Sequence, residues 1–334
     1  MNEASRKLTI LIVALIVIAL NMATFVSAYP QMFQSAPNKA RDFSGYYVAA
    51  WRLFFNPTKI YAGVAPPGDY PISPRPSTYR YAPSLLLLAS PFLFFNYQTA
   101  MILFNLIQLF LLPVMAIMIY RILQGRNLLL VSTVLVLVLL QPLPGLLDVF
   151  QTWRWHQVLA VINTGSLANV KDTFSWSYYY NWIDGNAKVL TTCLLLSCFY
   201  FGRILRPYSS GFFLGLAFFD PRFALLSLPL GFVYNRTVIR PFLAGMLGTL
   251  LASNFLIFYH SIGLQFVKSI VYHPTGFYAY SWIPFYAIIG LTLINYRQII
   301  SLLRESIQAL RRRVERDRFK TIDVTQQITV AAEM

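Results

Sequence analysis

The feature that most constrains this chain is a series of apolar runs, several of about 20 residues, separated by short basic loops. A helical run of that length matches the hydrocarbon thickness of a bilayer. A single run could be the core helix of a soluble domain, but soluble domains carry about twice the 12% of charged residues found here. The sequence therefore predicts an all-α, polytopic bundle of transmembrane helices with almost no soluble domain.

The predicted spans lie within residues 1–297. The first, 8–28, ends in Val26-Ser-Ala28, which resembles a signal-peptide cleavage site, but its apolar stretch is too long for one and we interpret it as a retained helix. Segment 82–96 is short and contains Pro83 and Pro91, so it is either a full crossing or a re-entrant piece. The remaining predicted spans are 99–121, 127–144, 187–202, 209–220, 222–235, 239–260 and 277–297.

The distribution of basic residues predicts the orientation of the chain. A net charge of +15 could indicate nucleic-acid binding, but the Lys and Arg residues gather at the N-terminus, in inter-helix loops and in the tail, 298–334. That is the positive-inside pattern, so we expect these parts in the cytoplasm, an even number of crossings and no nucleic-acid partner. The tail would lie along anionic lipid headgroups. The basic residues before the tail are Arg6, Lys7, Arg121, Arg126, Arg203, Arg206, Arg236 and Arg240.

This orientation leaves three segments outside the cell, at about 29–81, 145–186 and 264–276. Loops of the length of the first two are usually functional or disordered, and their aromatic clusters argue against disorder. Residues 43–55 look like an interfacial amphipathic helix. Residues 176–182, with two Trp and three Tyr, look like part of an aromatic belt at the membrane surface.

Acidic side chains are scarce, with 12 Asp and Glu in the whole chain. Asp42 directly precedes the predicted interfacial helix, where its carboxylate could cap the helix or take part in chemistry. Asp220 and Arg222 interrupt two short apolar runs, which could be half-depth helices meeting at a break. Arg222 could bind a phosphate through its planar fork, or pair with Asp220 in a tight turn. The six acids on the outer side or near a span end are Asp42, Asp69, Asp148, Asp172, Asp184 and Asp220.

Three groups of motifs follow one another along the chain. Asp42-Phe-Ser-Gly-Tyr-Tyr-Val-Ala-Ala50 is followed by Ile60-Tyr-Ala-Gly63 and by Tyr81-Ala-Pro83. Gly185-Asn-Ala-Lys188 then opens a helix, and Ser210–Pro221 is a Gly-containing helix ending in Pro. The ordered set resembles the polyprenol-phosphate-mannose-dependent mannosyltransferases of the GT-C glycosyltransferase superfamily. The chain departs from that family at Asn186, where Gln is usual, and at Asp220, where Lys is usual.

The resemblance implies a mannosyl transfer from a polyprenyl-phosphate donor to a lipid or glycan acceptor, on the extracytoplasmic face of the cell membrane. The reaction would invert the anomeric centre, with Asp42 as general base, and would use no cofactor or metal. The donor phosphate would be bound by Arg222, Lys188 and His273. The residues expected in the acceptor and sugar pocket are Tyr46, Tyr47, Tyr81, Asn186 and Asp184.

Two other functions remain open at this point. The chain could be a non-catalytic membrane subunit or scaffold that retains the same fold, because two motif positions are altered. It could also be a transporter of a lipid or small solute, since transporters use broken helices such as the one at Asp220. No matching second half is visible in the sequence, and the long outer segments favour an extracytoplasmic site over a transport path. No HExxH, phosphate-binding loop or GxSxG motif supports a metallohydrolase, an ATPase or a serine hydrolase.

Overall fold

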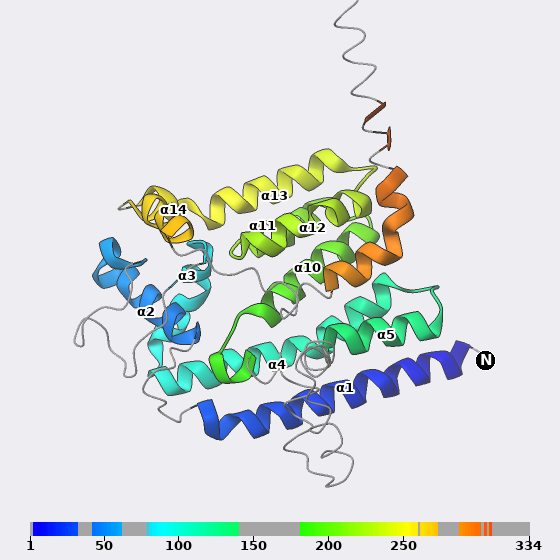
Figure 1. The fold of residues 1–334 in the computed structure, drawn as a ribbon, viewed down its shortest axis with the longest axis horizontal. Helices are drawn as coiled ribbons and strands as arrows, with labels where there is room; N and C mark the ends of the chain where they lie inside the picture. The colour runs from blue at the N-terminus through cyan, green and yellow to red at the C-terminus, as the bar shows by residue number, and fades with distance from the viewer. Residues whose placement is uncertain are drawn as a thin grey trace, which may run out of the picture. The chain divides into compact units, whose positions relative to one another are not determined.

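The computed structural model of the chain describes residues 3–32, 42–61, 79, 81–139, 181–259, 261–272, 287–301, 304–305 and 307–308. These residues form helices and turns, with no β-strand among them. The chain divides into two compact units, Met1–Gly290 and Leu291–Met334. The first unit contains all the labelled helices of Figure 1.

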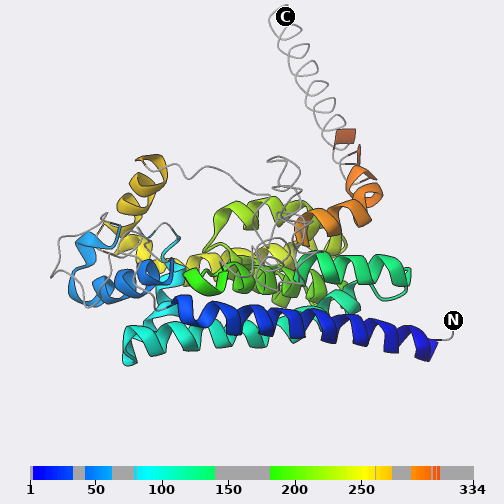
Figure 2. The same ribbon diagram turned by 60° about the horizontal axis from the view of Figure 1, so that its bottom comes forward.

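Two helices of the described part are long and apolar enough to cross a membrane. They are α1, Glu3–Met32, and α4, Tyr97–Ile122, which lie side by side in Figures 1 and 2. Helix α5, Leu128–Leu139, packs against α1, where the Asn21 side chain donates a hydrogen bond to the carbonyl of Leu139. Both long helices expose rows of large apolar side chains, such as Leu15 and Val26 on α1 and Phe110 on α4. Contiguous apolar surface of this kind is typical of a face that contacts lipid.

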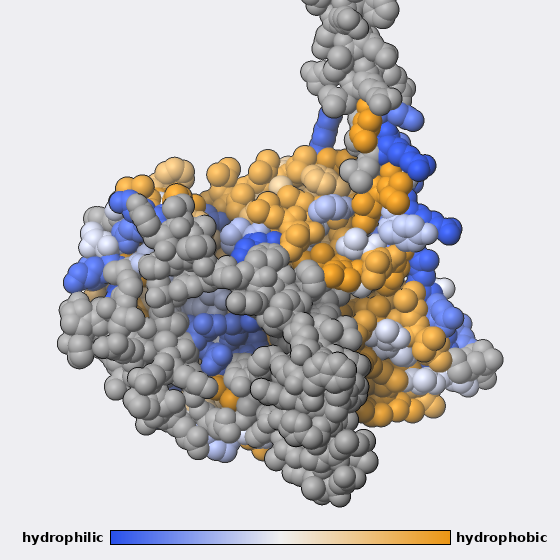
Figure 3. Space-filling view, viewed as in Figure 1, coloured by the Kyte–Doolittle hydropathy of each residue, from blue (hydrophilic) through white to orange (hydrophobic). Residues whose placement is uncertain are grey.

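Four further helices complete the main bundle. They are α10 (Lys188–Arg203), α11 (Pro207–Ala217), α12 (Pro221–Tyr234) and α13 (Ile239–Ser253). Helices α11 and α13 approach through glycines: a Cβ added at Gly215 would lie 2.6 Å from the carbonyl oxygen of Met246, and one at Gly245 would lie 2.5 Å from that of Tyr208. Small residues four apart, here Gly211 and Gly215, let helix backbones approach in this way. Figure 3 shows hydrophobic surface over α13 at the top of the view.

Shorter elements surround one end of the bundle. Helix α2, Asp42–Phe55, forms where the interfacial helix was expected, but most of it is buried and only Phe54 and Phe55 at its end expose large apolar side chains. Helix α3, Ser84–Ala89, continues into the 3₁₀ helix Ser90–Phe94. Another 3₁₀ turn, Phe255–Phe258, precedes α14, Ile262–Tyr272, which is helical where the sequence suggested an outer loop. A third 3₁₀ turn, Pro57–Lys59, follows α2.

Several helix lengths bear on the predicted spans. The helical segment formed by α3 and its 3₁₀ extension is about 20 Å long, which is too short to cross a hydrocarbon core of about 30 Å as one helix. Helices α11 and α12 have 11 and 14 residues, so each rises only about 17–21 Å. Trp182, expected in an aromatic belt at the membrane surface, is instead fully buried against Phe25 of α1. Packing of the 181–184 turn against α1 and α4 buries this indole, which would otherwise favour the membrane surface.

The basic loops meet at one end of the main bundle. The Arg6 guanidinium at the start of α1 donates to the carbonyl of Arg126, and that of Arg203 at the end of α10 donates to the carbonyl of Gln124, at 3.0 Å. Gly202 packs against Tyr234 and Asn235 at the end of α12. The N-terminus, the 121–127 loop, the 203–206 loop and the end of α12 therefore share one end of the helices.

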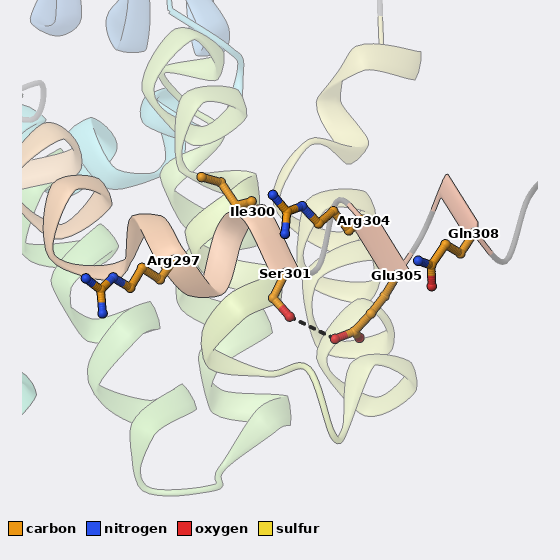
Figure 4. Close-up of a pocket in the computed structure, with 6 residues that line it drawn as sticks. All are labelled: Arg297, Ile300, Ser301, Arg304, Glu305 and Gln308. Carbon is orange, nitrogen blue, oxygen red and sulfur yellow. Dashed lines mark hydrogen bonds between the residues drawn. The ribbon is translucent and has the colours of Figure 1, made fainter.

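The second unit is described over 291–301, 304–305 and 307–308. Figure 4 shows a pocket along this segment, in which the hydroxyl of Ser301 donates a 2.9 Å hydrogen bond to the Glu305 carboxylate. Its lining is basic and polar, and it includes none of the residues that the sequence analysis selected. The lining residues are Arg297, Ile300, Ser301, Arg304, Glu305 and Gln308.

Candidate functional site

Asp42 is the first residue of α2, as the sequence suggested, but its carboxylate does more than cap that helix. The side-chain amide of Asn186, which follows 144 positions later, donates a hydrogen bond to the Asp42 carboxylate. Asn186 is buried, with 6% of its surface exposed, and Asp42 is partly buried. Two motif residues from distant segments of the chain are therefore in direct contact.

A helix C-cap positions Asn186 for this contact. Residues 181–184 form a short helical turn, and Gly185 follows in the left-handed conformation with φ of 61°. The backbone N–H of Asn186 then donates to the carbonyl of Asn181 at 3.0 Å, which is the Schellman arrangement. Glycine adopts this conformation at no steric cost, and a Cβ here would also lie only 2.5 Å from the Cβ of Phe43. Gly185 thus holds Asn186 beside the start of α2.

Two tyrosines extend the site beyond Asp42. The hydroxyls of Tyr46 and Tyr81 share a hydrogen bond, and their rings meet edge to face with centroids 5.2 Å apart. Burial, reinforced by the other tyrosine and by the charge of Asp42, raises the pKa of Tyr46 well above its ordinary value. Burial and the charges of Asp42 and Asp220 likewise raise the pKa of Tyr81. Both hydroxyls therefore keep their protons and can donate hydrogen bonds throughout the physiological pH range.

Tyr81 also connects Asp42 to the break between α11 and α12. The backbone N–H of Ala82 donates to the carbonyl of Phe219 at 3.0 Å, and the Tyr81 ring packs against that of Phe219. Beyond Phe219, Arg222 donates from Nε and Nη2 to the two carboxylate oxygens of Asp220, at 2.8 and 2.9 Å. The tight turn with an Asp–Arg pair, one of the two interpretations open from the sequence, is thus what the structure contains.

Lys188 lies within the electrostatic influence of both parts of the site. As the first residue of α10, it interacts with the charges of Asp42, Asp184, Asp220 and Arg222. Three carboxylates and two cations are therefore gathered at the end of the bundle opposite the basic loops. We define the Asp42 cluster as Asp42, Tyr46, Tyr81, Asp184, Asn186, Lys188, Asp220 and Arg222. Figure 3 shows hydrophilic surface in a hollow over the start of α10, the helix that contributes Lys188.

The remaining sequence-selected residues lie elsewhere. The Tyr47 hydroxyl donates to the carbonyl of Phe95 at 2.8 Å, and its ring packs against Phe43 and Tyr97, so Tyr47 holds α2 in place instead of joining the cluster. Successive side chains of an α-helix point about 100° apart, so the adjacent residues Tyr46 and Tyr47 face different neighbours. His273, expected at the donor phosphate, and the acids Asp69, Asp148 and Asp172 fall outside the described residues.

Sequence reasoning did not select two other buried polar side chains near this end of the bundle. Asn181 has 2% of its surface exposed and Gln108 only 1%. Asn181 belongs to the aromatic stretch 176–182, and Gln108 lies within the apolar run 99–121. The sequence feature that could have indicated Gln108 is a polar amide within a predicted membrane span. Burying such a group destabilises the protein unless it forms hydrogen bonds.

The described residues contain no group of three or more His, Cys, Asp and Glu side chains arranged to hold a metal ion. Comparisons with protein-family models, curated proteins and solved structures gave no match for this chain. The class of site is therefore defined by its own geometry: a carboxylate held by an amide, two protonated tyrosines and two cations at one end of a helical bundle.

Proposed function

We propose that this chain is a polytopic membrane glycosyltransferase of the GT-C type, which moves a hexose, mannose in the simplest case, from a polyprenyl-phosphate donor to a lipid or glycan acceptor. One observation carries the proposal. Residues picked from three separated motifs by family resemblance lie in one cluster, with Asp42 bonded to Asn186 and Tyr81 linking both to Arg222. Packing alone gives no reason for acids and cations from these motifs to converge.

The proposed reaction needs one base and one site for a phosphate. The acceptor hydroxyl oxygen attacks the anomeric carbon of the sugar and forms the new glycosidic bond, while its proton passes to the Asp42 carboxylate. The bond between that carbon and the phosphate oxygen breaks, and the polyprenyl phosphate leaves with the electron pair. Attack opposite the leaving group inverts the anomeric centre. The Asn186 amide donates a hydrogen bond to one oxygen of the Asp42 carboxylate and so orients it.

The leaving phosphate needs charge stabilisation more than protonation, because it is already a weak base. Lys188 is within electrostatic range of Asp42, and Arg222 is within electrostatic range of Tyr81. We assign binding of the donor phosphate to these two cations. Tyr46 donates its proton to Tyr81, so the Tyr81 hydroxyl supplies one further donor.

The arrangement of charges supports an extracytoplasmic site. The basic loops occupy one end of the bundle and the Asp42 cluster the other, separated by α10, whose 16 residues rise about 24 Å. By the positive-inside rule the basic end faces the cytoplasm. A polyprenyl-phosphate sugar in the outer leaflet would then present its headgroup at the level of the cluster.

The test is sugar transfer by membranes that contain the full-length chain, measured with radiolabelled polyprenyl-phosphate sugars. We expect Asp42→Asn to lower the rate about 10²–10⁴-fold, because it removes the proton acceptor. The amide oxygen can still accept the hydrogen bond from Asn186, so folding should be retained. Tyr47→Phe is a matched control, since it removes a hydroxyl from the same helix outside the cluster.

Near wild-type activity in the Asp42→Asn protein would show that Asp42 is not the base, and Asp184 and Asp148 would be tested next. Thermal unfolding of each variant in detergent separates loss of chemistry from loss of fold. If no polyprenyl-phosphate sugar is used by the wild-type chain, the transferase proposal itself fails.

One observation favours a second candidate, a non-catalytic subunit with the same fold. Asp220 engages two nitrogens of the Arg222 guanidinium, the geometry that a phosphate would otherwise use. In a non-catalytic member the pair would simply close the turn between α11 and α12. Binding of a polyprenyl-phosphate sugar without turnover would support this alternative.

A further inference from the structure

Three buried amide side chains in and beside the Asp42 cluster carry atoms without hydrogen-bond partners in the described part of the chain. Neither the oxygen nor the nitrogen of the Gln108 and Asn181 amides has a partner, and the oxygen of the Asn186 amide has none. All three residues are at most 6% exposed. Burying a polar group without a hydrogen bond destabilises the folded state, so these amides are available to bond a ligand.

The three amides belong to segments that meet at the junction between α4 and the start of α10. Asn181 and Asn186 belong to the same turn, closed by the hydrogen bond between their backbones. Helix α4 runs along this segment, since Asn105 donates to the Trp182 carbonyl at 2.8 Å and Ser197 of α10 donates to the Met118 sulfur at 3.3 Å.

The position of Gln108 on α4 follows from these two contacts. At about 3.6 residues per turn, the direction of Gln108 lies between those of Asn105 and Met118. Along the helix axis it lies one turn beyond Asn105, which contacts Trp182. Gln108 therefore faces the segment that contains Asn186, the residue bonded to Asp42.

The amide oxygens of Asn105 and Asn235 are also unpartnered, although the nitrogens of both side chains donate hydrogen bonds. Both atoms of the Asn254 amide, by contrast, have partners. The Asn254 oxygen accepts from the backbone N–H of Ser84 at 3.3 Å, and its nitrogen donates to the Leu250 carbonyl at 3.0 Å. Such pairing is the rule for buried polar groups, and exceptions call for a ligand or ordered water. Gln108 and Asn181 are the buried amides of the described residues in which both polar atoms lack a partner, and Asn186 is bonded to the proposed catalytic base.

We propose that Gln108, Asn181 and Asn186 form a subsite that binds the hydroxyl groups of the transferred hexose. Each carboxamide presents a donor and an acceptor side by side, and each sugar hydroxyl can both donate and accept, so neighbouring hydroxyls match an amide well. The subsite rests on the proposed function, because it places the sugar next to Asp42 and leaves the phosphate to Lys188 and Arg222.

The subsite is tested by binding to the purified full-length chain in detergent, measured calorimetrically with two short-chain probes. One is a polyprenyl phosphate and the other a polyprenyl-phosphate mannose. We expect the wild type to prefer the sugar-bearing probe. Asn181→Leu and Gln108→Met should each reduce that preference about tenfold and leave the affinity for the sugar-free probe unchanged, since each removes hydrogen bonds to the sugar alone.

Stability measured without any probe gives an independent readout. Replacing an unpartnered amide by an apolar side chain of similar size loses no hydrogen bond, so both variants should unfold at or above the wild-type temperature. The control Asn254→Leu breaks three hydrogen bonds away from these amides, and it should unfold at a lower temperature while keeping the preference for the sugar.

The outcomes separate the two proposals. If the wild type prefers the sugar-bearing probe and the variants retain that preference, the subsite is wrong and the transferase proposal stands. If the wild type binds both probes equally, the subsite is wrong and the transferase proposal is decided by the transfer assay. If the wild type binds neither probe, both proposals fail. If Asn181→Leu and Gln108→Met unfold at a lower temperature, as the control does, the amides hold structural water and the subsite is overturned.

Discussion

Replacing Gly185 by alanine tests whether the turn before α10 positions the candidate site. Gly185 lies between the two halves of the contact: it precedes Asn186, and a Cβ added to it would meet the Cβ of Phe43, which follows Asp42. The first atom of the Phe43 side chain cannot move without its backbone. Alanine at this position therefore forces the start of α2 away from the turn.

Two features of the structure contribute to the loss of folding free energy expected for Gly185→Ala. The φ of 61° places alanine in the left-handed region, which costs about 1–2 kcal/mol for a residue with a Cβ. The 2.5 Å approach to Phe43 adds overpacking of about 1–3 kcal/mol. We expect Gly185→Ala to destabilise the protein by about 2–5 kcal/mol and to weaken the Asp42–Asn186 contact at the same time.

Two other glycines isolate these contributions. Gly125 has a φ of 88° with nothing within 4 Å of an added Cβ, so Gly125→Ala should show the backbone cost alone, about 1–2 kcal/mol. Gly248 lies within α13 in open space and has no positive φ, so Gly248→Ala should be neutral or stabilising by about 0.5–1 kcal/mol.

The assay is unfolding of the three variants and the wild type in one detergent, followed by tryptophan fluorescence because Trp182 is buried beside the turn. The expected order of stability is Gly248→Ala, wild type, Gly125→Ala and then Gly185→Ala. A Gly185→Ala protein no less stable than Gly125→Ala would refute the packing of Phe43 against the turn, and with it the argument that this turn sets the geometry of the site.

Three further predictions concern packing, charge and topology. Gly211→Ala should lower stability by about 1–3 kcal/mol, because its Cβ would overlap the carbonyl of Phe242 on α13; a melting temperature unchanged from wild type would contradict the close α11–α13 contact. Arg222→Ala should reduce donor use about tenfold to hundredfold, the effect of losing a charge-assisted bond of roughly 1.5–3 kcal/mol, and should leave the buried Asp220 carboxylate without its ion pair. Adding Asp220→Asn should restore folding but not activity, and restored activity would show that Arg222 is purely structural. A reporter fused after Lys320 should show the tail in the cytoplasm, and an extracytoplasmic signal would reverse the placement of the Asp42 cluster.

The sequence by itself determined the helical class of the chain and the positions of its main helices. Apolar length and proline or glycine breaks are local properties, so helices α1, α4 and α10 lie within a few residues of the ranges 8–28, 99–121 and 187–202. Whether each helix crosses a bilayer stays a prediction from hydropathy and charge. The scarcity of acids, likewise visible in the sequence, is what reduced the candidates for a base to a few residues, Asp42 among them.

Only the tertiary structure decided which of these residues meet. Tyr46 and Tyr47 are equivalent in the motif, yet one faces Asp42 and Tyr81 and the other bonds to Phe95, because α2 is buried on most sides. Amphipathic periodicity alone had suggested a helix on the membrane surface. The contact between Asp42 and Asn186, 144 positions apart, and the unpartnered amide of Gln108 depend on how distant segments pack, which no local pattern encodes.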